Sequence, residues 1–286
     1  MHASRNTLRT AALLTALSGL ILVVGSFFGP LGLVVALVAA IGMNCAAYVA
    51  SDKVALRAMR AYPVSEAMQP VMYRIVRELS TGARQPMPRL YVSPTAAPNA
   101  FATGRDPRHS AVCCTEGILT MLDERELRAV LAHELSHVHN RDILVSSITT
   151  ALASAVMLGV QLAWLLPFGR PADDEDGGLV NGLFLLVLAP VAALVVQLGV
   201  SRSREYEADA SGVVLTGDPL GLAAALRKLE AGTRALPLRP APELQTTSAL
   251  MIANPFRPEG WSRLFSTHPP MADRVARLER MAGYPR

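Results

Sequence analysis

The feature that most constrains this chain is the long stretch from position 10 to position 51, which contains no Asp, Glu, Lys or Arg. Two further uncharged stretches run from 143 to 169 and from 177 to 201. A helix of about 20 residues is long enough to cross the hydrocarbon core of a bilayer. The first stretch therefore predicts two spans separated by a turn at Gly29 and Pro30, and each of the others predicts one. The predicted spans are 10–28, 31–50, 144–166 and 179–200.

The composition excludes several other classes of protein. Hydrophobic residues make up 51% of the 286 residues and charged residues only 17%, against about 25% in a typical soluble domain. The apolar content excludes a disordered chain, and three cysteines in a chain of this length exclude a disulfide-stapled mini-protein. The second predicted hairpin contains Asn181 and Pro190, so a re-entrant or protein-packed pair is an alternative to two complete spans.

The charges between the spans predict an orientation. The net charge is +2 for residues 1–9, +2 for 51–142, −3 for 168–178 and +3 for 201–286. Because Lys and Arg concentrate on the cytoplasmic side of membrane proteins, both large polar segments are expected in the cytoplasm. The sequence pI of about 9.2 then reflects the basic residues on the cytoplasmic side. The sequence has no basic patch with interleaved aromatic residues, so a nucleic-acid partner is not expected. The lipid bilayer is the expected partner.

The chemistry begins in a segment that is expected to be a helix starting after Asp123. His133 and His137 are four residues apart and share one helical face, where two imidazoles can hold one zinc ion. Glu134 adjoins the first histidine, so its carboxylate can take a proton from a water on the metal. His139 lies two residues beyond His137, on roughly the opposite face, and is not expected to be a ligand.

A catalytic zinc site usually has three protein ligands, so one more is needed. Glu205 and Asp209 are four residues apart in a helix-compatible run, and either carboxylate can bind the metal while the other supports a ligand histidine. The alternative is a solvated acidic cluster that pairs with Arg202 and Arg204.

Several motifs in this order resemble the HtpX-like membrane zinc metalloproteases, which are related to the CAAX-prenyl endopeptidases. The likeness covers nearly the whole chain. It includes the two amino-terminal spans, the segments Asn99–Gly104, HELSH at 133–137, REYEAD at 204–209 and STHPP at 266–270, and Arg274.

The resemblance implies one Zn²⁺ per chain, held by His133, His137 and Glu205, with Asp209 supporting a ligand. It also implies that His268 and Arg274 lie near the catalytic centre and stabilise the transition state or the ligands. A proline-rich turn that caps a helix is the alternative for those two residues.

We therefore expect a mainly α-helical chain with a small β-sheet, an α+β fold, in which about four transmembrane helices carry a cytoplasmic zincin-like metalloprotease domain. Because His137 lies six residues before one uncharged stretch and Glu205 closely follows the next, the second hairpin separates two halves of one active site. The expected parts are an amino-terminal transmembrane hairpin at 1–50, the first catalytic half at 51–142, the second hairpin at 143–200 and the second catalytic half at 201–286.

Three short strands are expected before the metal helix, at 89–92, 99–103 and 110–114, with a turn at 104–107. An exposed edge strand can hold an extended polypeptide through main-chain hydrogen bonds. Asn99, Ala100, Phe101 and Ala102 are our candidate substrate-binding residues; a strand that only packs on the helix is the alternative. Residues 234–262 are rich in proline and predict a long loop with a short helix near 246–252. The loop could be a lid over the cleft, but a loose connection is favoured.

These observations predict a membrane-embedded zinc endopeptidase in which Glu134 is the general base and His268 assists catalysis. We expect it in the inner or plasma membrane of a bacterium, with membrane proteins or unfolded polypeptides as substrates, and the resemblance implies membrane-protein quality control. A prenyl-protein processing protease and a non-catalytic membrane metal sensor are the alternatives. A transporter is disfavoured because the predicted spans contain no ionisable residue. The sequence does not indicate an oligomeric state.

Overall fold

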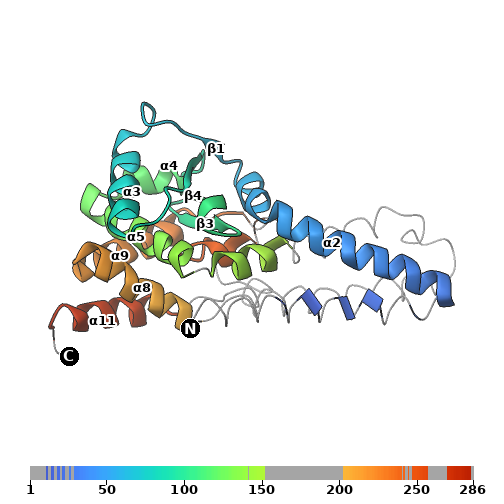
Figure 1. Cartoon of the computed structure of the whole chain (residues 1–286). Coiled ribbons are helices and arrows are strands. Elements are labelled where there is room, and N and C mark those ends of the chain that lie inside the picture. Colours follow the sequence, from blue (N-terminus) through green and yellow to red (C-terminus); the bar gives the residue numbers. More distant parts are fainter. Residues whose placement is uncertain are drawn as a thin grey trace.

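In the computed structural model, the described part of the chain comprises scattered positions before residue 29 and between 241 and 244, and the ranges 29–140, 142–151, 202–239, 247–256 and 269–284. The predicted span 10–28 is described only at single helical positions, and the second predicted hairpin lies outside the described residues beyond position 151. Figure 1 shows the described elements as a body of helices around a small sheet, from which the long helix α2 projects.

The sheet has four strands in the order β1-β2-β4-β3. β2 and β4 run parallel, and β1 and β3 are antiparallel to their neighbours. The three predicted strands are present within one residue or so of the expected bounds, and β1 is a two-residue addition that the sequence analysis missed. The strands are β1 (Tyr62–Pro63), β2 (Arg89–Ser93), β3 (Ala100–Gly104) and β4 (Ser110–Thr115).

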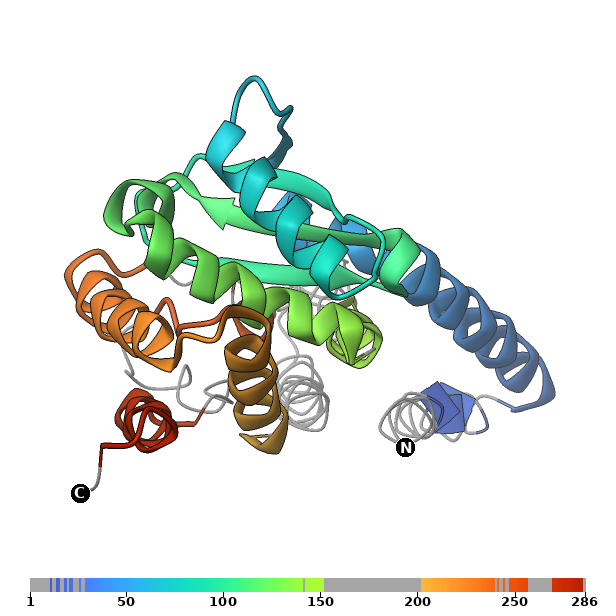
Figure 2. The same cartoon turned by 60° about the vertical axis from the view of Figure 1, so that its left-hand side comes forward.

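The two faces of the sheet bury different helices because successive strand residues point to opposite sides. Along β4, Val112 and Cys114 join the core formed with α3 and α5, whereas Ala111 and Cys113 join the core formed with the end of α2. Figure 2 shows α3 and α5 side by side on one face of the sheet. The helix that carries His133 and His137 is therefore packed against the sheet. The helices named here are α2 (Gly29–Ala58), α3 (Pro70–Gly82) and α5 (Glu124–His139).

Helix α5 begins where its sequence predicts. The Asp123 side chain accepts a hydrogen bond from the Glu126 amide at 2.9 Å, and the Glu126 carboxylate accepts one from the Asp123 amide at 3.0 Å. This capping box satisfies two amide groups at the start of the helix. Other helical segments are α4 (Glu116–Met121), residues 143–151, α8 (Arg202–Thr216), α9 (Pro219–Ala235), α11 (Met271–Met281) and the 3₁₀ turns Pro107–His109 and Ser248–Leu250.

Helix α2 contains the one candidate membrane span in the described part of the chain, Gly29–Ala46, with a mean hydropathy of 1.9. The helix continues past the predicted end at residue 50 to Ala58, because its last turns bury Ala55 and Leu56 against the sheet. It therefore crosses the expected boundary between the first hairpin and the catalytic half. Asn44 Nδ2 donates a 2.8 Å hydrogen bond to Ser18 Oγ, so a described position of the preceding segment lies beside α2.

The expectation of a loose connection at 234–262 is wrong for residues 247–253. These residues are buried, and Ile252 N donates a 3.0 Å hydrogen bond to the Ala100 carbonyl at the edge of β3. The predicted short helix near 246–252 is the 3₁₀ turn Ser248–Leu250. The apolar residues Leu250, Met251 and Ile252 account for the burial, since they fill both cores of the sheet.

Candidate metal centre

Two imidazoles converge on the inner side of α5. His133 and His137 lie one helical turn apart, with Nε2 atoms separated by 3.3 Å and ring planes at 89° to each other. His133 is completely buried and His137 is partly exposed. His137 is therefore the more accessible member of the pair.

Glu205 of α8 completes the cluster. Its carboxylate oxygens lie 3.7 Å from the Nε2 atoms of both histidines, and one ligand atom from each of the three residues lies within 4.8 Å of the others. Ligand atoms at about 2.0–2.1 Å from one tetrahedral zinc ion are roughly 3.4 Å apart. The observed separations of 3.3 Å and 3.7 Å fit that arrangement, and two imidazoles with one carboxylate are a donor set of catalytic zinc sites.

Each histidine is oriented by a carboxylate on its other ring nitrogen. Asp209 Oδ1 lies 3.0 Å from Nδ1 of His133, and Asp142 Oδ2 lies 3.2 Å from Nδ1 of His137. Such partners fix the ring so that Nε2 faces the metal. The sequence predicted a supporting role for Asp209 but not for Asp142. A carboxylate five residues after the last histidine, just beyond the helix end at Asn140, was the available signal.

Arg274 of α11 ties this cluster together. It is completely buried and donates hydrogen bonds of 2.9 and 2.6 Å to the two carboxylate oxygens of Asp209. Its guanidinium also lies 3.4 Å from Glu205 and donates to the Ile252 carbonyl at 3.1 Å. Burial alone would raise the pKa of Asp209, but the Arg274 charge lowers it to about 2. Asp209 is therefore ionised, as a support for a ligand histidine requires.

Glu134 follows His133 on α5, and its predicted role as a proton carrier stays a prediction. The side chain is buried, no side chain of the described residues donates a hydrogen bond to its carboxylate, and the backbone of Ala102 lies beside it. Burial raises the pKa of Glu134 to about 7, against the opposing charge of His137. Burying a carboxylate without enough hydrogen-bond donors costs free energy. Water or a bound substrate can supply the missing donor.

The four candidate substrate-binding residues lie at the β3 edge, but the chain itself occupies part of that edge. Asn99 Nδ2 donates to the Ala253 carbonyl at 2.8 Å, and the Ala100 carbonyl accepts from Ile252. Phe101 points into the core beside α2, on the other face of the sheet.

Ala102 lies next to Glu134. On one side of it Ile252 is hydrogen-bonded to the Ala100 carbonyl, and on the other side Ser147 Oγ accepts a 3.0 Å hydrogen bond from the Gly104 amide. A substrate role for the Asn99–Ala102 segment stays a prediction, and the main chain around Ala102 is where it applies best.

The three residues whose ligand atoms converge among the described residues are His133, His137 and Glu205, and the expected exclusion of His139 stays a prediction. His268 lies outside the described residues, so its predicted catalytic role stays a prediction.

The family model and the most similar relatives identify one family. The model of "Peptidase family M48" matches residues 66–282. The chain is 57% identical to the "Protease HtpX homolog" of Kineococcus radiotolerans, and the match covers 100% of both chains. It is 53% identical to the protein of the same name from an Arthrobacter species, over 100% of this chain and 99% of the relative. The crystal structure of S. mikatae Ste24p aligns with a TM-score of 0.46 and 16% identity, over 96% of this chain and 65% of that one.

Proposed function

The chain belongs to peptidase family M48 as a metalloprotease of the HtpX type, and from that premise we propose that it is a zinc endopeptidase that cleaves membrane or unfolded proteins at the cytoplasmic face of the membrane. The observation that supports this most is the convergence of His133, His137 and Glu205, with ligand atoms within 4.8 Å of one another beside the buried carboxylate of Glu134.

The proposed mechanism assigns a step to each residue. His133, His137 and Glu205 would hold the ion, which when bound supplies a Lewis acid that acidifies water and polarises a carbonyl group. Glu134 accepts the proton of the attacking water at its carboxylate and then donates it to the leaving amine. In the site without an ion, burial raises the pKa of Glu134 to about 7, and a general acid-base group works best when its pKa is near the operating pH.

The membrane placement rests on α2 and on the charge pattern. The span Gly29–Ala46 is only 11% buried within the protein, so most of its apolar surface needs another apolar environment. The basic residues at the end of α2 favour the cytoplasmic side for the catalytic body. Near the site, the helical residues 143–151 include Ser147, whose hydroxyl binds the Gly104 amide at the β3 edge.

Substrates presented close to the bilayer would follow from this placement. The β3 edge is bounded by Ile252 on one side and Ser147 on the other, so only a short main-chain stretch beside Ala102 is available for pairing. A polypeptide must be locally unfolded to enter it, which supports a role in membrane-protein quality control. Dedicated processing of prenylated proteins is the alternative with the same chemistry.

The proposal is tested with purified wild type, Glu134→Gln and Glu205→Ala, by metal analysis together with cleavage of an unfolded membrane protein in proteoliposomes. The wild type should contain one zinc ion per chain and cleave the substrate. Glu134→Gln should keep the zinc and lose about 10²–10⁴-fold in rate, because the proton carrier is removed. Glu205→Ala should lose both. Full activity of Glu205→Ala would show that Glu205 is not the third metal ligand. Cleavage of prenylated peptides alone would contradict the proposed substrate class.

A further inference from the structure

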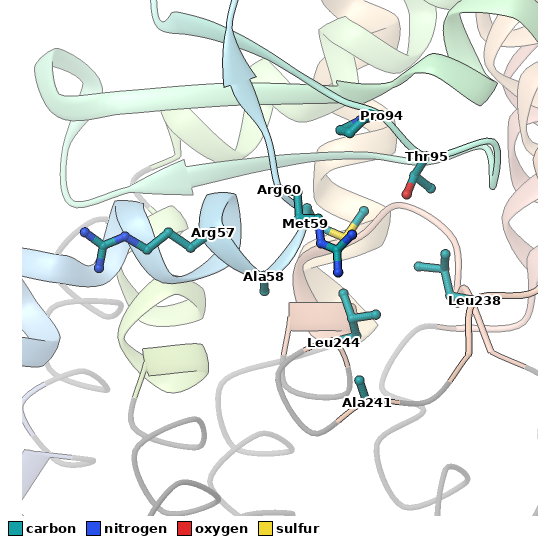
Figure 3. Close-up of a pocket in the computed structure, with 9 residues that line it drawn as sticks. All are labelled: Arg57, Ala58, Met59, Arg60, Pro94, Thr95, Leu238, Ala241 and Leu244. Atoms are coloured by element: carbon teal, nitrogen blue, oxygen red, sulfur yellow. The ribbon is translucent and has the colours of Figure 1, made fainter.

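The end of α2 lies at one end of the sheet. Ser93, the last residue of β2, donates a 2.6 Å hydrogen bond from its hydroxyl to the Met59 carbonyl. Met59 and Arg60 line the same cavity as Pro94 and Thr95, which follow β2 (Figure 3). Because β2 and β4 run parallel, the end of α2 is at the carboxyl ends of both strands.

Followed backward from Met59, α2 leads to the opposite end of the sheet. The Arg105 guanidinium, in the turn between β3 and β4, lies over the Tyr48 ring at 5.8 Å from its centre. At about 1.5 Å per residue, α2 covers about 16 Å between Tyr48 and Met59. At about 3.3 Å per residue, the strand also covers about 16 Å between Ala100 and Arg105. The two lengths agree, so α2 runs along the whole of β3 and Tyr48 lies beside the β3–β4 turn.

Tyr48 marks the expected membrane surface. The candidate span ends at Ala46, so Tyr48 lies about 3 Å beyond it along the helix. Tyrosine is enriched at this level because its ring is apolar and its hydroxyl is polar, and arginine side chains extend to the headgroups there. The β3–β4 turn, which carries Arg105, is therefore at the level of the headgroups. This step rests on the membrane anchoring proposed above.

A second apolar segment reaches the same end of β3. The uncharged stretch 143–169, which predicts a membrane span, begins four residues before Ser147. The Ser147 hydroxyl accepts a 3.0 Å hydrogen bond from the Gly104 amide and lies 2.9 Å from the Thr103 hydroxyl. Two segments that are far apart in the sequence thus place the Gly104 end of β3 at the bilayer surface.

The candidate metal centre lies beside the middle of the same strand. Ala102 is next to Glu134, the proposed proton carrier. From Ala102 to Arg105 an extended strand covers about 10 Å. Together with the distance of about 3 Å between Ala46 and Tyr48, the path along β3 from the membrane boundary to Glu134 is about 13 Å long.

We propose that β3 sets a minimum distance between the membrane segment of a substrate and the bond that is cleaved. An extended polypeptide covers about 13 Å with about four residues. The substrates are then membrane proteins with an unfolded segment directly next to a span, cleaved no closer than about three to five residues from that span. A shorter connection does not reach Glu134, whereas a longer one reaches it with slack. This inference rests on the proposed endopeptidase function and names its substrate class.

The test compares two substrates of the full-length protein in proteoliposomes. One has a single membrane span joined to an unfolded tail of identical short repeats, and the other is the same tail without the span. Identical repeats offer the same side chains everywhere, so only the distance from the bilayer distinguishes one repeat from the next. Mass spectrometry of the products gives the shortest stub that is left on the span. Glu134→Gln serves as the control for a contaminating protease.

We expect the free tail to be cut in every repeat and the anchored tail to keep a shortest stub of about three to five residues. A bond cut directly at the span, or a shortest stub of about ten residues or more, would overturn the role of β3 in setting the distance. Absence of cleavage in both tails would instead contradict the endopeptidase function, so the two failures are distinguishable.

The level of the β3–β4 turn is tested without any measurement of activity. Spin labels are attached to Arg108→Cys in this turn and, as the matched control, to Thr120→Cys on α4 at the opposite end of β4; both positions are exposed. Cys45 is replaced by serine, and the buried Cys113 and Cys114 should stay unlabelled. In electron paramagnetic resonance, a nickel chelate on the lipid headgroups should relax the label at position 108 several-fold more strongly than the label at 120. Equal relaxation would overturn the placement of the turn at the bilayer surface.

Discussion

The guanidinium of Arg274 donates a 2.6 Å hydrogen bond to Oδ1 of Asp209, and the same oxygen lies 3.0 Å from Nδ1 of His133. One buried ion pair thus connects α11 to His133 of the candidate metal centre on α5. Both charged groups are almost fully shielded from solvent. The ion pair is the part of the site on which the orientation of His133 depends.

We predict that Arg274→Met destabilises the protein by about 3–5 kcal/mol, because it leaves the Asp209 carboxylate buried without its cation. Thermal unfolding of the detergent-solubilised protein with a chelator present would measure the change without any contribution from metal. The double variant Arg274→Met with Asp209→Asn should recover part of the loss, since the unpaired charge is gone. A single variant as stable as the wild type would show that the ion pair has no structural role.

Asp142 is predicted to act on metal affinity through His137. Its Oδ2 atom lies 3.2 Å from Nδ1 of His137, so Asp142→Ala should weaken zinc binding by about 10–100-fold while the fold is kept. Competition with a chromogenic chelator measures the affinity. Asp106→Ala is a suitable control, since that carboxylate binds the exposed His109 in the turn before β4. Equal affinities of the two variants would contradict the assignment.

Much of the catalytic half could be predicted from the sequence because its signals are local. The Asp123 capping box, the four-residue spacing of His133 and His137, and the turn signals around the short strands each depend on neighbouring residues only. The same holds for the pair Glu205 and Asp209 on α8, although the choice of Glu205 as the ligand and of Asp209 as its support came from the resemblance. The site then requires one long-range event, the packing of α8 on α5.

The features that the sequence analysis missed depend on contacts between distant segments. The burial of Met251 and Ile252 against β3 comes from pairing between segments far apart in the chain, which no local pattern reveals. The extension of α2 to Ala58 was hidden because charged residues from Asp52 onward mark the end of the membrane span and not the end of the helix. Asp142 was overlooked because its partner lies on the other side of a helix end.

Gly212 is predicted to set the distance between α5 and α8. A Cβ atom at this position would lie 3.1 Å from His133 N and 3.3 Å from His133 Cα, both of them backbone atoms. Gly212 also follows Glu205 and Asp209 on the same helical stripe, since these three positions are spaced by four and then three residues. Gly212→Ala should therefore push α8 away from the histidines and cost about 1–3 kcal/mol in stability.

The same variant should lower zinc affinity, because Glu205 moves with α8. Gly82→Ala, at the end of α3, is the matched control, since nothing lies within 4 Å of its added Cβ. Unfolding and chelator competition on both variants would test the prediction. If Gly212→Ala binds zinc as tightly as Gly82→Ala, the helix spacing is not limiting.

Asp218 gives a prediction of how stability depends on pH at a site far from the metal. Its Oδ1 atom caps α9 by accepting from the Gly221 amide at 2.9 Å and also accepts from Arg125 of α5 at 2.8 Å. The hydrogen bond from Arg125 lowers the pKa of Asp218 below its ordinary value. Because the folded pKa is the lower one, the stabilisation is fully present above the unfolded value of about 4 and is lost as the pH falls through the folded value.

We expect Asp218→Asn to be less stable than the wild type by about 0.5–1 kcal/mol at pH 7, since the amide can still cap the helix but cannot pair with Arg125. The difference should shrink as the pH falls below about 4, where the wild-type carboxylate takes up its proton. Unfolding curves of both proteins between pH 7 and pH 3 measure this. A constant difference across the range would show that capping geometry, and not the charge of Asp218, accounts for the stabilisation.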